Sequence, residues 1–268
     1  MIAHRLPRVP TLAGERPYRR VRDALLTTVA GALATNSGLL WNIEALVLSA
    51  RYQQWIAHSP WGRHSIRQRD RISLWRAVAR RGLLTSGTVA LEFGIADGVA
   101  TRWWSRSGVA FAAWHGFDTF EGLPTDWYRA GTPVMSAGTF TPSAGPHAVP
   151  MVEAPFPYEW HAGMIEERLP DFVRPDAPLF ILIDVDLFEP ARAILEWLKA
   201  NWRSGDLVYF DEAFDPWNEG LALRRAIDAG MRLSAIAHTG MALLTQLLAV
   251  EATHEGTAQT GKHSEHRR

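Results

Sequence analysis

Two long apolar runs in the second half of the chain each end in carboxylates. The first run is Leu179–Phe188, LFILIDVDLF, and the second is Asp206–Glu212, DLVYFDE. Neither run alternates apolar with polar residues, as a strand with one solvated face would. Near-continuous Ile, Leu, Val and Phe is typical of strands that are covered on both faces, as in a parallel sheet between helices. The two runs therefore predict central strands of an α/β protein.

The surrounding sequence alternates strand-like and helix-like segments. This alternation predicts right-handed crossovers and a doubly wound, mostly parallel sheet over residues 81–250. Only Thr239–Met241 separates the last two strands, which predicts an antiparallel hairpin at one edge of a seven-stranded sheet. The predicted strands are Val89–Phe93, Val109–Trp114, Tyr158–His161, Leu179–Ile183, Leu207–Phe210, Ser234–His238 and Ala242–Leu248, and the predicted helices are Gly98–Trp104, Met164–Leu169, Ala191–Asn201 and Asn218–Ala229.

The segments outside this alternating pattern differ in composition. Residues 1–20 are basic and rich in Pro, and we expect them to be flexible. Residues 21–80 have helical periodicity, with a turn at Ser59–Gly62, and predict an N-terminal helical extension. Residues 124–157 are rich in Pro, Gly, Ser and Thr, which indicates a lid over a substrate or a disordered insert. From about residue 251 the polar tail is expected to be disordered.

Composition restricts the class of protein. A chain of 268 residues with 47% hydrophobic residues can bury the core of one large domain. The formal net charge of +0 argues against a nucleic-acid-binding surface. The chain has no cysteine, which excludes disulfides and thiol nucleophiles and fits a cytoplasmic protein. Polar residues interrupt Ala24–Ala50, the most apolar stretch near the N-terminus, so we expect no membrane-spanning helix.

A turn with two glycines follows the first predicted strand. In Leu91–Gly98, LEFGIADG, Gly94 would allow a sharp turn and Gly98 would let a helix start close to the strand. The spacing is not the G-x-G-x-x-G that binds a dinucleotide pyrophosphate, which argues against a nicotinamide-dependent oxidoreductase with the same topology. Taken alone, the motif is equally compatible with a tight turn that packs a helix on a strand.

Two acids near this turn favour a nucleoside ligand. Glu92 precedes the turn, where its carboxylate could pair with an ammonium group. Asp118 follows the next predicted strand, and its offset from Gly94 (118 − 94 = 24) is close to the ~20 residues at which an acid reaches ribose hydroxyls. The combination predicts an adenosine-type ligand that carries an amino-acid end.

Five segments together resemble the class I S-adenosylmethionine-dependent methyltransferases, and more narrowly the branch of the macrocin and sugar O-methyltransferases. The resemblance spans residues 88 to about 230 and implies a Rossmann-like fold. It also implies methyl transfer from S-adenosylmethionine to a small-molecule hydroxyl, on a sugar or a secondary metabolite. The segments are LEFGIADG (Leu91–Gly98), GFDTFEGLP (Gly116–Pro124), GMIEERLP (Gly163–Pro170), LIDVDLFEPARAIL (Leu182–Leu195) and GDLVYFDEAF (Gly205–Phe214).

By position, the resemblance implies where the cofactor binds. The glycine turn would line its methionine end, the loop after the next strand would meet its ribose and adenosine, and the Gly163–Ile165 turn would flank the adenine. The implied cofactor-binding residues are Glu92, Gly94, Ala96, Gly98, Asp118, Phe120, Gly163, Met164 and Asp184, and the candidate catalytic residues are Asp184, Asp186 and His161.

The resemblance also implies a magnesium site. Relatives use the first acid of the IDVD strand and two adjacent residues after the next strand as ligands, which here are Asp184, Asp211 and Glu212. Magnesium prefers oxygen ligands and would lower the pKa of a substrate hydroxyl. Many relatives have Asp or Asn where this chain has Glu212. This departure leaves open a relative that binds S-adenosylmethionine without a metal or without O-methylation.

Structural roles stay open for several of these residues. Asp184 and Asp186 could cap the following helix, and Glu212 could accept hydrogen bonds from the backbone of residues 213–217. His115 and His161 are alternatives for the general base, or structural histidines. We also expect a small-molecule acceptor as the main partner, and a homo-oligomer formed through the N-terminal helices.

Overall fold

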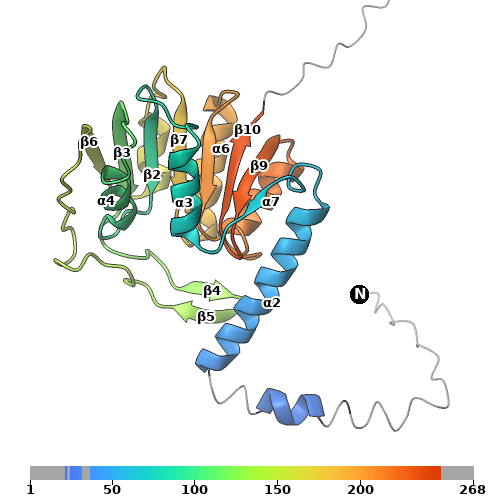
Figure 1. The fold of residues 1–268 in the computed structure, drawn as a ribbon. Coiled ribbons are helices and arrows are strands. Elements are labelled where there is room, and N and C mark those ends of the chain that lie inside the picture. The colour runs from blue at the N-terminus through green and yellow to red at the C-terminus, as the bar shows by residue number, and fades with distance from the viewer. Residues whose placement is uncertain (1–21, 23–24, 32–36, 249–268) are drawn as a thin grey trace, which may run out of the picture. The chain divides into compact units, whose positions relative to one another are not determined.

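The computed structural model describes residue 22, residues 25–31 and residues 37–248 (Figure 1). The chain divides into two compact units, residues 1–51 and residues 52–268. The predictions for residues 1–20 and for the tail after residue 251 lie outside the described residues. Of the helices in the described part, none is both long and apolar enough to cross a membrane.

The described part of the first unit is helical. Residues 25–31 form a helical segment, and α2 (Ser37–His58) begins in the first unit and ends in the second. The predicted N-terminal helices are therefore present. Their apolar side chains Ile43, Leu46 and Val47 are exposed, Leu46 by 71%.

The second unit is built on one large sheet. Its strands are β1 (Ile66–Arg67), β2 (Val89–Phe93), β3 (Ala113–Asp118), β6 (Tyr158–Ala162), β7 (Leu179–Ile183), β8 (Leu207–Phe210), β9 (Leu233–His238) and β10 (Leu243–Leu247). The strand order is β1-β9-β10-β8-β7-β2-β3-β6, and β10 alone runs antiparallel to its neighbours. The predicted α/β sheet with an antiparallel hairpin is confirmed. The prediction of seven strands is wrong, because β1 adds an eighth strand beside β9.

The central strands have the burial that their apolar sequences predict. Every residue of β2, β7 and β8 is buried, and all three strands have the predicted bounds. The next strand, β3, starts at Ala113 instead of Val109. Parallel pairing with β2 places Ala113 opposite Val89, and Phe111 packs into the core from the loop before the strand.

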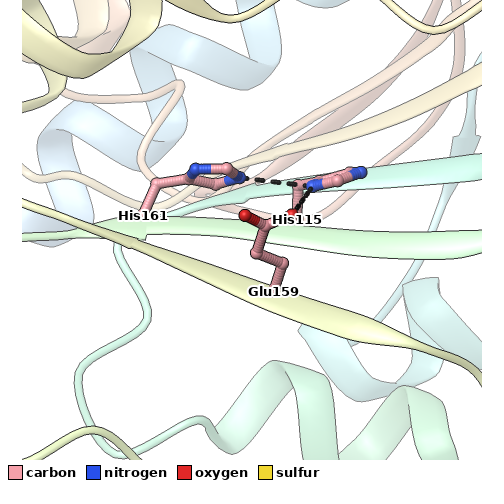
Figure 2. Close-up of side chains that lie close together, drawn as sticks. All are labelled: His115, Glu159 and His161. Atoms are coloured by element: carbon pink, nitrogen blue, oxygen red, sulfur yellow. Dashed lines mark hydrogen bonds and ion pairs between the residues drawn. The ribbon is translucent and has the colours of Figure 1, made fainter.

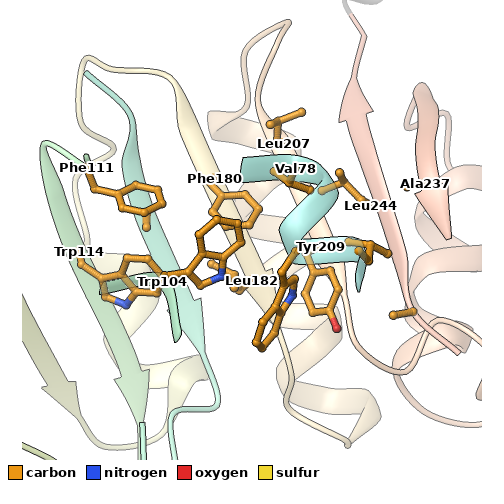
Figure 3. Close-up of a cluster of buried hydrophobic side chains, with 14 of the residues drawn as sticks. Val78, Trp104, Phe111, Trp114, Phe180, Leu182, Leu207, Tyr209, Ala237 and Leu244 are labelled. Atoms are coloured by element: carbon orange, nitrogen blue, oxygen red, sulfur yellow. The ribbon is translucent and has the colours of Figure 1, made fainter. Parts of the chain in front are cut away.

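Helices cover both faces of the sheet (Figure 1). One face carries α3 (Arg71–Arg80) and α4 (Val99–Ser105), and the other carries α5 (Ile165–Arg168), α6 (Phe188–Asn201) and α7 (Glu219–Asp228). Under α3 and α4 lies a core rich in aromatic rings (Figure 3). Its largest buried members include Trp75, Trp104, Trp114, Phe180 and Tyr209.

The long segment 124–157 is more regular than its composition suggests. It contains a separate antiparallel pair, β4 (Trp127–Arg129) and β5 (Thr132–Met135). Later in the segment, the backbone N–H of His147 donates to the carbonyl of Phe120 at 2.7 Å. The segment is therefore attached to the body of the second unit, and the alternative of a disordered insert is wrong.

Candidate active site at the strand ends

The residues that end or follow five parallel strands lie side by side at one edge of the sheet. Backbone hydrogen bonds of 3.0 Å join them in series: Gly94 N–H to Phe117, Asp184 N–H to Phe93, Asp211 N–H to Ile183, and Gly163 N–H to Asp118. We call Gly94, Asp118, Gly163, Asp184 and Asp211 the strand-end rim. The rim brings together positions that the sequence predicted as cofactor-binding or metal-binding.

The centre of the rim lies at the point where the chain reverses its direction across the sheet. From β2 the chain continues outward through β3 and β6, and it then returns to β7 on the other side of β2 and continues through β8. The connections that follow β2 and β7 therefore run in opposite directions across the sheet. Ligands of open α/β sheets bind in the crevice that this reversal leaves outside the carboxyl ends of the strands.

The glycine turn reaches this crevice with a backbone that favours glycine. Gly94 has a φ of +84°, and a Cβ there would lie 1.8 Å from the carbonyl oxygen of Asp184. Gly98 has a φ of +73° and caps the start of α4. Because no side chain fits at Gly94, the loops after β2 and β7 can touch at the reversal point.

Asp118 fixes the shape of the glycine turn. One carboxylate oxygen accepts hydrogen bonds from the backbone N–H groups of Ile95 at 2.6 Å and Ala96 at 2.8 Å. The other oxygen accepts from the N–H of Phe120 at 2.7 Å. A carboxylate has about four acceptor positions, so one remains for a ligand hydroxyl. The position therefore fits the predicted contact with a ribose.

Three of the six described non-glycine residues with a positive φ lie in the loops at the strand ends. Ala96, Phe120 and Asp186 have φ values of +46°, +57° and +60°, although none is a glycine. They belong to the loops after β2, β3 and β7, respectively. Such conformations cost about 1–3 kcal/mol each and are concentrated at functional sites. All three residues were predicted site residues, and the side chain of Phe120 is fully buried.

Glu92 lies beneath the turn rather than in the crevice. Its carboxylate is buried and accepts hydrogen bonds from the hydroxyl of Thr101 in α4 and, at 2.8 Å, from the indole N–H of Trp114. Burial raises the pKa of Glu92 to about 7, and these hydrogen bonds oppose the rise. The carboxylate thus supports α4 from below, a different position from the predicted pairing with a ligand's ammonium.

Two rim acids share an arginine. The Arg71 guanidinium at the start of α3 lies 3.4 Å from a carboxylate oxygen of Asp211 and 3.7 Å from one of Asp184. Tyr209 also donates its hydroxyl hydrogen to Asp211. Burial and the negative charge of Asp211 raise the pKa of Asp184 well above its usual range. Arg71 therefore occupies the place between these acids that the sequence assigned to a magnesium ion.

Glu212 is turned away from the other two predicted metal ligands. It accepts a 2.7 Å hydrogen bond from Arg129 of β4, which also donates to Asp215 at 2.8 Å. The Arg129 side chain is 1% exposed and lies over the ring of Trp127. Burial raises the pKa of Glu212 to about 8, although Arg129 opposes the rise. The predicted structural alternative had named backbone donors from residues 213–217, and the observed donor is Arg129.

These contacts do not fit a magnesium ion at Asp184, Asp211 and Glu212. Magnesium requires several oxygen ligands around one point. Here two of the carboxylates contact Arg71, and the third contacts Arg129. Among the described residues, the one group of three or more His, Asp or Glu side chains close enough to share a metal ion is elsewhere, at His115, Glu159 and His161.

The capping alternatives for Asp184 and Asp186 are wrong. The residue at the N-cap of α6 is Leu187, which follows both acids. Asp186 instead lies close enough to the rim to be affected by its charges. Burial and the negative charge of Asp211 raise the pKa of Asp186 to about 7, and the positive charge of Arg129 opposes the rise.

The remaining predicted residues lie at the β6 side of the rim. Gly163 bonds to Asp118 as described, and Met164 is the N-cap of α5. His161 is oriented differently from the prediction of a general base. Its Nε2 lies 3.2 Å from Nδ1 of His115, which is three residues before the end of β3, and its ring stacks on Phe117 at 4.4 Å.

Residues from the long segment pack on the glycine turn. Ser143 donates its backbone N–H to Asp97 at 2.8 Å and its hydroxyl at 2.5 Å. Pro150 lies against Gly98, where a Cβ would come within 3.3 Å of its ring. Residues of this segment therefore lie against the glycine turn.

A groove of about 630 Å³ between α3 and α4 is separate from the rim. Its basic lining is Arg76, Arg80, Arg102 and Arg106, with Ile72 and Trp103 as apolar walls. The groove follows the outer sides of the two helices rather than the strand ends. We therefore assign the candidate active site to the rim, where the glycine turn and the acids meet.

The sequence did not identify Arg71, Arg129, Asp215 or Glu219 as site residues. The acids had a visible signal, since Asp211, Glu212, Asp215 and Glu219 come from one short segment. So many carboxylates around a buried strand end require a cation. The sequence did not show which of its many arginines would supply it.

Comparison with known proteins found similar solved structures at low sequence identity. No protein-family model and no curated protein matches the sequence. The similar solved structures include CalS11, a calicheamicin methyltransferase, at 20% identity over 75% of this chain and 91% of that chain with a TM-score of 0.48. The O-methyltransferase NovP is 18% identical over 67% of this chain and 80% of that one, with a TM-score of 0.43. An O-methyltransferase from Bacillus cereus in complex with SAH is 13% identical over 76% and 91%, with a TM-score of 0.42. At these identities the likeness concerns the fold alone.

Proposed function

We propose that this protein transfers a methyl group from S-adenosylmethionine to a hydroxyl of a small molecule, a sugar or a secondary metabolite. The observation that carries the proposal is the meeting of the glycine turn with Asp118 and Asp184 at the strand ends, where open α/β sheets bind their ligands. S-adenosylmethionine carries ribose hydroxyls, and Asp118 keeps one acceptor position for such a hydroxyl. A dinucleotide is disfavoured because the glycine spacing is not the G-x-G-x-x-G that binds a pyrophosphate.

Asp186 is the residue we assign to the proton transfer. When S-adenosylmethionine is bound, it supplies an electrophilic methyl group. The acceptor oxygen forms a bond to the methyl carbon while the carbon–sulfur bond breaks, and its proton must go to a base. The pKa of Asp186 is raised to about 7 by burial and by Asp211. A base with a pKa near the working pH accepts a proton most effectively.

We further propose that the reaction needs no magnesium at Asp184, Asp211 and Glu212. Arg71 and Arg129 already neutralise these carboxylates at distances of 2.7 to 3.7 Å. A metal ion would first have to displace both guanidinium groups. The departure from the relatives' ligand pattern at Glu212 supports the same conclusion.

Calorimetry of the full chain with S-adenosylmethionine and S-adenosylhomocysteine tests the cofactor proposal. We expect both to bind, and an Asp118→Ala variant to bind much more weakly. Asp176→Ala is the matched control, because Asp176 lies in the loop before β7, at the opposite edge of the sheet. Failure of the unaltered protein to bind either compound at high micromolar concentration would contradict the proposal.

Methyl transfer to a panel of sugar and polyketide hydroxyls tests the activity. We expect turnover that persists in excess chelator and is lost in Asp186→Asn, while cofactor binding survives that substitution. Turnover that disappears on chelation would refute metal independence. Cofactor binding without transfer to any acceptor would instead favour the alternative, a relative that binds S-adenosylmethionine without catalysis.

A further inference from the structure

We propose that His115, Glu159 and His161 form a binding site for a zinc ion on the face of the sheet between β3 and β6 (Figure 2). The Nδ1 atom of His115 lies 3.2 Å from Nε2 of His161 and 3.6 Å from a carboxylate oxygen of Glu159. The three ligand atoms all lie within 4.8 Å of one another. This cluster is separate from the acids of the strand-end rim.

The backbone of two paired strands holds the three side chains together. In the parallel pairing of β3 with β6, His115 is opposite Glu159 and Phe117 is opposite His161. Glu159 and His161 are two residues apart, so they project from the same face of β6. Sites on strands keep their geometry better than sites on loops. The ligand set is therefore arranged before any metal binds.

The spacing of the ligand atoms fits a tetrahedral ion. Zinc bonds to histidine nitrogen and carboxylate oxygen at ~2.0–2.2 Å, which places neighbouring ligand atoms of a tetrahedron roughly 3.3 Å apart. The observed separations of 3.2 and 3.6 Å lie on either side of this value. The Glu159 side chain is 65% exposed, which leaves a path for the ion and room for water as a fourth ligand.

Aromatic side chains hold the two histidine rings in place. His115 packs edge-on against Phe172 at 5.1 Å, and His161 stacks on Phe117. Two imidazoles with one carboxylate select zinc and similar transition metals over magnesium.

Zinc bound at this position would link the edge strand β6 to its neighbour β3. In the strand order, β6 is the last strand and has β3 as its one neighbour. Its chain continues directly into Gly163 of the strand-end rim and then into Met164. A bound ion would therefore stabilise the strand that carries this side of the proposed cofactor site, without taking part in the methyl transfer.

The test is binding of Zn²⁺ to the metal-free full chain by calorimetry, with the absorption spectrum of the Co²⁺ form as a second readout. We expect one site with tetrahedral Co²⁺ bands, and a loss of affinity of roughly tenfold or more in His115→Asn and Glu159→Gln. The matched control is His147→Asn, because exposed His147 has a carboxylate of Glu121 at 3.2 Å but belongs to no such three-residue group. The tail histidines His254, His263 and His266 are present in every variant.

Glu159→Gln also separates loss of the site from loss of the fold, because Glu159 is largely exposed. We expect this variant to keep the metal-free melting temperature of the parent and to lose the rise of a few degrees that Zn²⁺ causes in the parent. Absence of zinc binding to the parent, or equal binding in the parent, His115→Asn and Glu159→Gln, would overturn the proposal. The measurement needs no methyl donor, so its outcome is independent of the proposed activity.

Discussion

The guanidinium of Arg129 lies 2.7 Å from the carboxylate of Glu212, inside the protein. Arg129 comes from β4 in the long segment after β3, whereas Glu212 follows β8 at the strand ends. This buried ion pair therefore attaches the segment 124–157 to the candidate active site. A buried pair of this kind is more important for holding one arrangement than for adding net stability.

Arg129→Met should destabilise the protein strongly. The substitution leaves Glu212 and Asp215 buried without their cation, which typically costs ~3–5 kcal/mol. Chemical denaturation at pH 7 measures the change. The control is Arg203→Met, which removes an exposed ion pair with Asp176 and should change the stability little. Equal effects of the two substitutions would show that the buried cluster does not hold the segment.

Arg71→Ala should create a divalent-cation site at Asp184 and Asp211. The substitution removes the guanidinium group that lies 3.4 Å from Asp211 and 3.7 Å from Asp184. The two carboxylates then repel each other more strongly, and a cation between them would relieve this repulsion. Electron paramagnetic resonance with Mn²⁺ measures the binding. We expect the variant to bind one Mn²⁺ ion more, weakly, than the parent or the control Arg76→Ala, five residues further along α3. Equal Mn²⁺ binding by parent and variant would mean that Arg71 does not block the site.

Asp118→Asn should weaken the binding of S-adenosylhomocysteine by roughly 10- to 100-fold. The amide nitrogen of asparagine cannot accept, so the N–H of Phe120 or those of Ile95 and Ala96 lose their acceptor. A hydrogen bond to a charged group contributes about 1.5–3 kcal/mol, and the turn would lose its fixed shape. Calorimetry measures the affinity, with Asp176→Asn as the control. Unchanged affinity would argue that the turn does not depend on Asp118.

The elements that the sequence predicted best are those with continuous apolar runs. The bounds of β2, β7 and β8 were correct, because burial on both faces leaves a signal in each strand's own residues. The short strands β1, β4 and β5 were missed. For β1 the pairing partner of Ile66 is Ala237, so the strand depends on a distant contact rather than on its local pattern.

The sequence predicted where the site residues lie along the sheet, but not the direction in which their side chains point. The carboxyl ends of parallel strands meet at one edge, so Gly94, Asp118 and Asp184 could be assigned to the rim from the strands alone. Whether an acid faces the crevice depends on its partners from other elements. Arg129 is 83 residues from Glu212 in the sequence, and Glu92 points to Trp114 under α4. No local pattern records such pairings.

Glu92→Gln should make the protein more stable relative to the parent as the pH rises from 5 to 8. Burial raises the pKa of Glu92 to about 7 in the folded protein, from an ordinary value of about 4.5. The folded state therefore binds the proton more tightly than the unfolded state does. The resulting stabilisation is complete below the unfolded pKa and is lost as the pH rises through about 7. A shift of this size corresponds to about 3 kcal/mol.

Glutamine reproduces the neutral form of Glu92 at every pH. Its carbonyl oxygen can accept from both Thr101 and Trp114, which donate to a single oxygen of Glu92. The parent must ionise this buried group above pH 7 and the variant need not, so the difference in unfolding free energy between them should grow with pH and then level off. Denaturant titrations at a series of pH values measure this difference, and the same substitution at exposed Glu153 is the control. A difference that stays constant from pH 5 to 8 would show that Glu92 keeps an ordinary pKa, and that its contacts with α4 and Trp114 are those of a carboxylate.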